Sequence, residues 1–283
     1  MSMVRSSRSL PAICLIAFLL AACLTAQSFA PLPGVRLWYT DSGGKATPIV
    51  LLHAATGTTD SWQKQIQPFT AAGYRVIAFD RRGWGKTEID PAAQPGSASD
   101  DLHNLIMFLK IDRFHLLGTA AGGFVAIDYA LSHPERLRSL VLAATIGGVT
   151  DEDYVALGRR LRPSQFDALP AELRELGPAY RASDKEGTEQ WAALELSSRH
   201  GGPRSPAQPL KNKITYAALE TIQSPTLLLS GGADMYAPPA AMQMLAKHIR
   251  KSLYVNVPDA GHSVNWEMPA RFNAEVLKFI GKH

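Results

Sequence analysis

The amino-acid sequence predicts an α/β fold, in which helices cover both faces of a mostly parallel sheet. Two observations carry this prediction. Apolar runs of strand length, such as Pro48–Leu52 and Thr226–Ser230, are continuous, as is typical of strands covered on both faces. Segments with the apolar spacing of a helix lie between these runs, so that strands alternate with helices. A length of 283 residues with 46% apolar residues allows one large core with an insertion.

The composition excludes several classes of partner and cofactor. The formal net charge is +4; Arg5 and Arg8 supply two of these charges, and residues 1–22 hold no acidic residue, so the remainder carries +4 − 2 = +2. Such a small excess, without a Lys/Arg run, predicts no nucleic-acid partner. The two cysteines are Cys14 and Cys23, so the body of the protein has no disulfide, thiol or zinc-type motif. No metal-ligand set or dinucleotide fingerprint stands out, and we expect no cofactor.

The first residues have the pattern of an export signal. Residues 1–22 begin with basic side chains and continue in an apolar run from Pro11 to Ala22, too short for a comfortable membrane span. The sequence Leu20-Ala21-Ala22-Cys23 resembles the lipobox of bacterial lipoproteins, which implies a lipidated Cys23 as the new N-terminus and membrane attachment. A rival cleavage site follows Ala30. We therefore expect a periplasmic or membrane-anchored lipoprotein, with a secreted protein as the alternative.

The first half of the body alternates between strands and helices. Val35–Thr40 alternates in polarity like a half-buried strand and ends at a Gly-containing turn. Asp100–Lys110 has the apolar spacing of a helix, with Ser99 or Asp100 as the expected N-cap. The further expected elements are strands over Pro48–Leu52, Tyr74–Asp80 and Leu137–Ile146, and helices around Trp62–Phe69 and over Gly122–Ser132.

The pattern changes after the strand that ends near Ile146. Residues 149–222 mix charges of both signs with helical spacing and Pro or Gly breaks, which predicts a helical cap ending in a flexible stretch near His200–Pro209. The alternation then resumes with a strand at Thr226–Ser230, a helix at Pro239–Ile249, a strand at Leu253–Val257 and a helix at Pro269–Ile280. The predicted domains are thus a core of residues 31–148 and 223–283 and a cap of residues 149–222.

The stretch from His115 to Phe124 runs from an apolar strand through a glycine-flanked turn into a helix. In the nucleophile elbow, Gly-x-Ser-x-Gly, such a turn presents a strained residue at the top of a sheet. Gly118 and Gly122 are in place here, but the residue between them is Ala120, whose methyl group cannot attack a substrate. A positive φ at this non-glycine position costs about 1–3 kcal/mol. We expect the strain to persist, because the flanking glycines permit close packing.

Four other landmarks accompany the elbow in a fixed order. They are Leu52–Gly57 and Asp80–Thr87 before it, and Ser230–Asp234 and Ala260–His262 after it. This set closely resembles the α/β-hydrolase superfamily, in particular capped bacterial enol-lactonases, haloperoxidase-like proteins and carbon–carbon-bond hydrolases. The resemblance covers about residues 34–148 and 223–283, whereas the insertion matches no motif.

The resemblance implies a role for each landmark. Asp234 would be the triad acid and His262 the base, and the backbone N–H groups of Ala55 and Ala121 would form an oxyanion hole. A carboxylate bonded to one imidazole nitrogen fixes the tautomer, so that the other nitrogen can accept a proton. Backbone donors do not depend on side-chain type, so the hole survives the departures at Ala54, usually Gly, and at the elbow. Asp234 as a helix cap and His262 as a loop residue are the plainer alternatives.

Three other side chains are candidates for lesser roles. His53 is expected to be a structural, hydrogen-bonded group. Trp84 either packs the loop after Asp80 or lines the substrate pocket. Thr119, one residue before the elbow position, is expected to point away from His262, because successive side chains of an extended segment face opposite ways.

The missing nucleophile leaves three interpretations open. The chain is a hydrolase of small ester, lactone or C–C-bond substrates that acts through a His–Asp dyad without a Ser nucleophile. Alternatively, it is a non-catalytic pseudo-hydrolase that binds a small ligand, or a Ser-to-Ala knockout of a Ser-Asp-His enzyme. We favour the first, because the hole and the dyad retain catalytic power without the covalent step. No motif encodes the substrate or the oligomeric state.

Overall fold

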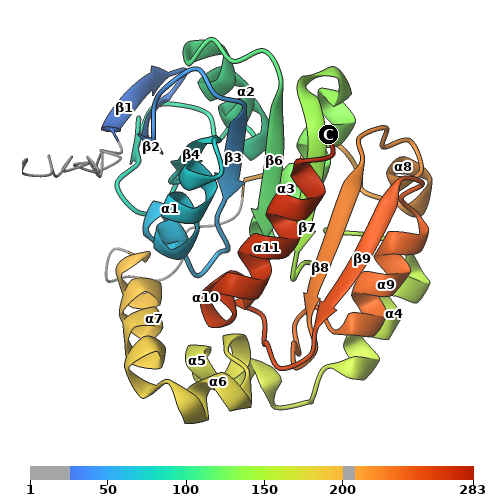
Figure 1. The fold of residues 1–283 in the computed structure, drawn as a ribbon. Helices are drawn as coiled ribbons and strands as arrows, with labels where there is room; N and C mark the ends of the chain where they lie inside the picture. The colour runs from blue at the N-terminus through green and yellow to red at the C-terminus, as the bar shows by residue number, and fades with distance from the viewer. Residues whose placement is uncertain (1–25, 200–207) are drawn as a thin grey trace, which may run out of the picture.

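The computed structural model describes residues 26–199 and 208–283 (Figure 1). The predicted signal peptide, Cys23 and most of the predicted flexible stretch lie outside these residues. The described chain forms a sheet in the order β1-β2-β4-β3-β6-β7-β8-β9, with β5 paired to β2. The strands from β4 to β9 in this order are parallel, whereas β1 and β2 add an antiparallel edge. The predicted α/β class, with its mostly parallel sheet, is confirmed.

The strands are β1 (Ala26–Leu32), β2 (Val35–Asp41), β3 (Pro48–Leu52), β4 (Arg75–Phe79), β5 (Glu88–Ile89), β6 (Phe114–Thr119), β7 (Leu137–Ala143), β8 (Thr226–Gly231) and β9 (Ser252–Val257). The helices of the core are α1 (Gln63–Ala71), α2 (Ala98–Phe108), α3 (Ala121–Ser132), α9 (Pro239–Lys247), α10 (Val264–Glu267) and α11 (Pro269–Ile280). The helices between β7 and β8 are α4 (Glu152–Leu161), α5 (Ala171–Glu175), α6 (Pro178–Ser183), α7 (Lys185–Ser197) and α8 (Tyr216–Leu219).

Two apolar cores lie on opposite faces of the sheet, which explains the continuous apolar strands. Side chains of β3 alternate between them: Val50 and Leu52 join the core under α2, α3 and α9, while Ile49 and Leu51 join the core under α1 and α11 (Figure 1). All four side chains are almost completely buried. The sheet is therefore packed on both faces, and it positions the loops that follow the carboxyl ends of its strands.

Several element boundaries differ from the sequence-based expectation. β1 was not expected as a strand; it pairs along its whole length with β2, from Ala26 opposite Asp41 to Leu32 opposite Val35. The N-cap of α2 is Ser97 and not Ser99 or Asp100, because the Ser97 side chain accepts the Asp100 N–H at 3.0 Å.

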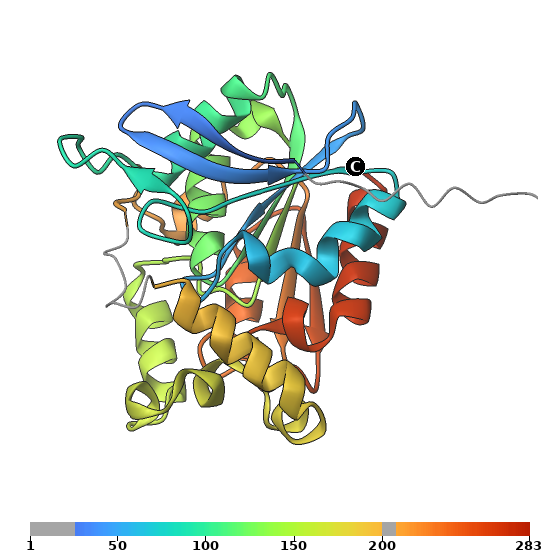
Figure 2. The same cartoon turned by 90° about the vertical axis from the view of Figure 1, so that its left-hand side faces the viewer.

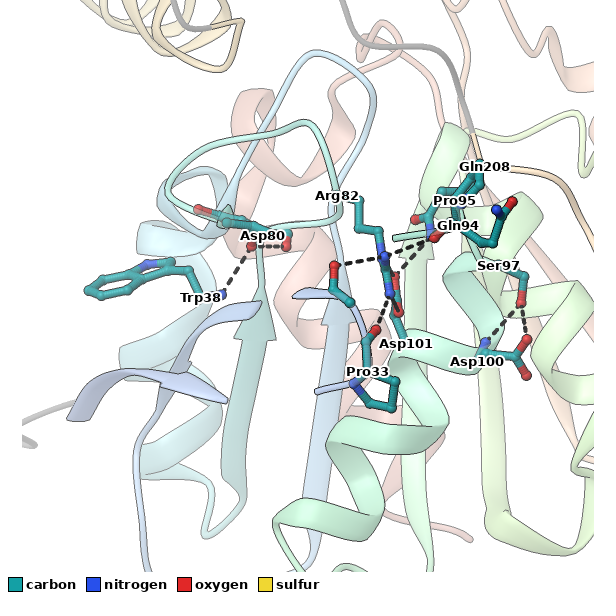
Figure 3. Close-up of polar contacts among 12 residues, drawn as sticks. Pro33, Trp38, Asp80, Arg82, Gln94, Pro95, Ser97, Asp100, Asp101 and Gln208 are labelled. Carbon is teal, nitrogen blue, oxygen red and sulfur yellow. Dashed lines mark hydrogen bonds and ion pairs between the residues drawn. The ribbon is translucent and has the colours of Figure 1, made fainter. Parts of the chain in front are cut away.

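Of the helices between β7 and β8, α5, α6 and α7 lie across the carboxyl ends of the strands, whereas α4 packs against α9 and α8 lies near the other end of the sheet, before β8 (Figures 1 and 2). The end of this insertion is tied to the core by a buried polar network (Figure 3). Arg82 makes a two-pronged ion pair with Asp101, at 2.8 Å for each contact, and Gln208 Nε2 donates to the same carboxylate at 2.9 Å. Arg82 also donates to the carbonyls of Pro33 and Gly34, so it packs the loop after β4. Among the described residues, no helix is long and apolar enough to cross a membrane.

Candidate active site

The elbow retains its strained conformation although it carries no nucleophile. Ala120 lies between β6 and α3 with φ 49° and ψ −118°. The expected close packing is present: a Cβ on Gly118 would lie 2.4 Å from the Gly122 carbonyl oxygen, and one on Gly122 would lie 2.2 Å from that of Leu52. The hydroxyl of Thr145 donates to the Ala120 carbonyl at 2.7 Å. Neighbouring groups therefore hold the residue in a conformation that costs about 1–3 kcal/mol.

The structure brings Asp234 and His262 together, from the loops after β8 and β9. His262 Nδ1 lies 2.8 Å from Asp234 Oδ2, and both side chains are buried. The other carboxylate oxygen, Oδ1, accepts the N–H groups of Tyr236 at 2.7 Å and Ala237 at 2.9 Å. Asp234 therefore orients the imidazole and also fixes its own loop. Nδ1–H donates to this carboxylate, which leaves Nε2 as the nitrogen available for proton transfer.

A cavity of about 170 Å³ joins the elbow to the dyad. Ala120, Ala121, Ala55 and His262 are all among its lining residues. In the described part of the chain, neither the Ala55 nor the Ala121 amide donates a hydrogen bond to the protein, and Ala121 is the first residue of α3. The predicted oxyanion-hole donors thus stand at the same cavity as the His–Asp pair.

Trp84 does not line this cavity. Its side chain is 4% exposed, and its Nε1 donates to the Ala55 carbonyl at 2.8 Å. Of its two predicted roles, packing of the loop is the one observed. The hydrogen bond from its Nε1 also holds the loop that carries Ala55. His53 is structural as expected: its Nδ1 donates to the Ala54 carbonyl, and its Nε2 accepts the Arg81 N–H at 3.1 Å. Burial lowers the pKa of His53 well below its ordinary value, so the ring is neutral.

The electrostatic surroundings favour a charged His262. Burial lowers the pKa of this imidazole, but the carboxylates of Asp234, Glu175 and Glu267 oppose that effect and raise the pKa to about 9. Protonated imidazole is therefore the main form at neutral pH. A protonated ring has no lone pair to accept a proton, but its Nε2–H can donate one.

Three residues that line the cavity lie outside the recognised motifs, and two of them belong to the insertion. Glu175 on α5 and Arg162 at the end of α4 line the cavity together with Tyr236. The Tyr236 ring lies 4.7 Å from the His262 ring and accepts a hydrogen bond at its hydroxyl from Arg174 Nη1 at 2.7 Å. No motif marks Arg162 and Glu175, because the insertion matches none, and Tyr236 lies two residues beyond the Ser230–Asp234 landmark.

Glu267 ties the insertion to the loop that carries His262. Its buried carboxylate accepts the N–H groups of Gly177 at 2.8 Å, Gly261 at 2.9 Å and Ser263 at 3.2 Å. Burial raises the pKa of Glu267 to about 6, and these three amides limit the rise. Since Gly177 lies in the short link between α5 and α6, this carboxylate holds the link and the histidine loop together.

Within residues 26–199 and 208–283, no group of three His, Cys, Asp or Glu side chains is placed to hold a metal ion. His262 and its carboxylate neighbours can supply acid–base catalysis, and the backbone amides at the cavity can stabilise an oxyanion.

Comparisons with known proteins identify the family and the fold. Residues 49–275 match the model of a family described as the alpha/beta hydrolase family. The chain is 31% identical over 267 residues to a 2-hydroxy-6-oxononadienedioate/2-hydroxy-6-oxononatrienedioate hydrolase of Pseudomonas putida, with 87% of this chain and 92% of the relative covered. A thermophilic esterase from Thermogutta terrifontis superimposes with a TM-score of 0.75 at 26% identity, covering 91% of this chain and 98% of the esterase. The enol-lactonase of Burkholderia xenovorans LB400 shares the fold, with a TM-score of 0.74 at 24% identity, over 89% of this chain and 99% of that one.

Proposed function

This chain belongs to the alpha/beta hydrolase family, and from that premise we propose that it hydrolyses small ester, lactone or C–C-bond substrates without a covalent intermediate. The observation that carries the proposal is the cavity that joins Ala120 to the amides of Ala55 and Ala121 and to His262. A carbonyl oxygen placed between the two amides would have its developing negative charge stabilised. Water takes the place of the missing hydroxyl as the attacking group.

The relatives support the class of bond that is broken. The Pseudomonas putida relative is named a hydrolase of 2-hydroxy-6-oxononadienedioate, and the structural neighbour at 26% identity is an esterase. Both reactions need a stabilised oxyanion and a proton donor for the leaving group, and this chain places both at one cavity. The cavity of about 170 Å³ accommodates a small acyl group.

A series of esters that share an acyl group but differ in leaving group tests this mechanism. Direct attack by water predicts that kcat rises with better leaving groups and that product appears without a burst, because no acyl-enzyme common to the series forms. The measurement is stopped-flow hydrolysis with the purified protein. A single kcat for the whole series, with a burst of one leaving group per active site, would contradict the proposal.

A second candidate function is ligand binding without turnover. It is favoured by one observation: Ala120 keeps a strained elbow conformation that serves nucleophile presentation, although no nucleophile is present. In that case the same cavity holds a small ester or lactone without cleaving it. Calorimetric binding of a substrate that remains intact after prolonged incubation would favour this second function over the first.

We also propose that the chain is exported and anchored to the membrane by a lipid on Cys23. The lipobox-like sequence supports this site, and so does the position of β1, because cleavage after Ala30 would remove five of the seven residues of a strand that pairs fully with β2. Palmitate labelling in a bacterial host is expected to mark the wild type and the Cys14→Ala control, but not Cys23→Ala. Equal labelling of both variants would overturn the assignment.

A further inference from the structure

A second carboxylate, that of Glu175, lines the cavity beside His262 and is not part of the Asp234–His262 pair. Glu175 ends the short helix α5 and is 5% exposed. It lines the same cavity as Ala120 and His262. Its main-chain carbonyl accepts the N–H groups of His262 at 2.8 Å and Ser263 at 3.1 Å, so the glutamate and the imidazole are joined through their backbones. The insertion therefore delivers an acidic side chain to the reaction centre.

We infer that Glu175 is the general base of this enzyme, taking a proton from the attacking water, while His262 acts as the general acid. The inference rests on the proposed function, because it assigns roles within the same hydrolytic site. It explains how the site works with alanine at the elbow. A covalent nucleophile needs a neutral imidazole, whereas attack by water needs a base close to the cavity and an acid close to the leaving group.

The charged groups around His262 favour this division of roles. Facing the imidazole are Asp234 from the β8 loop, Glu175 from α5 and Glu267 from α10; the cavity wall adds Arg162 from the end of α4 and Tyr236, whose hydroxyl accepts from Arg174. The carboxylates outweigh burial and raise the pKa of His262 to about 9. A carboxyl group and an imidazole that share one cavity can serve as an acid–base pair.

The proposed step balances in protons and electrons. The water oxygen forms a bond to the carbonyl carbon as Glu175 takes a proton from the water. The carbonyl π pair moves onto the oxygen that faces the amides of Ala55 and Ala121. When the pair returns, the bond between the carbonyl carbon and the leaving atom breaks, and the leaving atom takes the proton of His262 Nε2. Transfer of one proton from Glu175 to His262 restores both groups, and the net reaction consumes one water.

The test is the pH–rate profile of the wild type beside Glu175→Gln, with Glu172→Gln on the same helix as the matched control. We expect wild-type kcat/KM to fall as pH rises through about 9, because His262 then loses the proton that it must donate. Glu175→Gln should lower kcat/KM about 100-fold or more, and the control should leave it unchanged. Formate is expected to restore part of the rate of Glu175→Ala, which a residue with a merely structural role would not allow.

The role of Glu175 and the proposed hydrolase function would be overturned by different results. Wild-type activity that rises through pH 9 and survives in Glu175→Gln would overturn the role of Glu175 and leave the hydrolase proposal standing. An absence of turnover by the wild type at every pH would overturn the proposed function itself. Folding of Glu175→Gln is checked by its effect in an Ala120→Ser background: loss of the carboxylate lowers the pKa of His262, so activity at pH 7 should rise if the variant is folded.

Discussion

Replacing Ala120 by serine is expected to convert the protein into a covalent hydrolase. The elbow already has φ 49°, and the dyad stands at the same cavity, so a hydroxyl at this position meets an oriented imidazole without backbone rearrangement. We expect kcat/KM for activated esters to rise about 100-fold or more at pH 9, because the triad then adds covalent catalysis to the oxyanion hole. Stopped-flow kinetics and intact-protein mass spectrometry should show a burst and an acyl adduct.

The pH dependence of this variant should be opposite to that of the wild type. Serine attack needs neutral His262, and since the pKa of this imidazole is raised to about 9, the rate of Ala120→Ser should increase with pH through that value. Ala121→Ser, which places a hydroxyl in the same cavity one residue away, is the matched control and should form no adduct. An Ala120→Ser protein that folds but neither forms an adduct nor gains activity would contradict the inferred geometry.

Removal of the imidazole is the second change with a large expected effect. His262→Ala deletes the proton donor and should lower kcat/KM about 10²–10⁴-fold. His248→Ala is the control, because the half-buried His248 at the end of α9 does not line the cavity. Its ring stacks on that of Tyr216, with the ring centroids 3.8 Å apart. Steady-state hydrolysis of one ester by both variants, with circular dichroism as a fold check, provides the measurement. Equal activity of His262→Ala and the wild type would show that the imidazole takes no part.

The positions of the dyad and the elbow were predictable because each depends on local sequence. Gly118 and Gly122 are needed where backbones approach closely, and Asp234 and His262 lie in the loops that follow β8 and β9, both of which were predicted as strands. Parallel strands present their carboxyl ends at one edge, so residues that follow them converge whatever their separation in sequence. The alternation of side chains along an extended segment predicted that Thr119 points away from His262, and Thr119 lines a small neighbouring cavity of about 20 Å³ instead of the one at Ala120.

The contribution of the insertion was not predictable. Glu175 reaches the cavity because the end of α5 is hydrogen-bonded to the loop that carries His262, and Arg162 ends α4, which packs against α9. No local sequence pattern records contacts between segments so distant in sequence. Trp84 was ambiguous for a related reason: an aromatic residue after a strand packs a loop or lines a pocket, and only its hydrogen bond to Ala55 decides between them. β1 was missed because its polar residues and its proline, Pro31, mark an exposed edge strand, whose sequence pattern is weak.

Turnover by the unaltered protein shows whether the chain hydrolyses a substrate without a covalent intermediate. The purified chain with Ala120 is incubated with a small ester, an enol-lactone and a C–C-bond substrate at pH 7, while product and intact protein mass are followed together. We expect hydrolysis of at least one substrate above the His262→Ala background, with no increase in the mass of the protein. No hydrolysis of any of the three, combined with activity of Ala120→Ser, would contradict it and identify the cavity as a ligand-binding site.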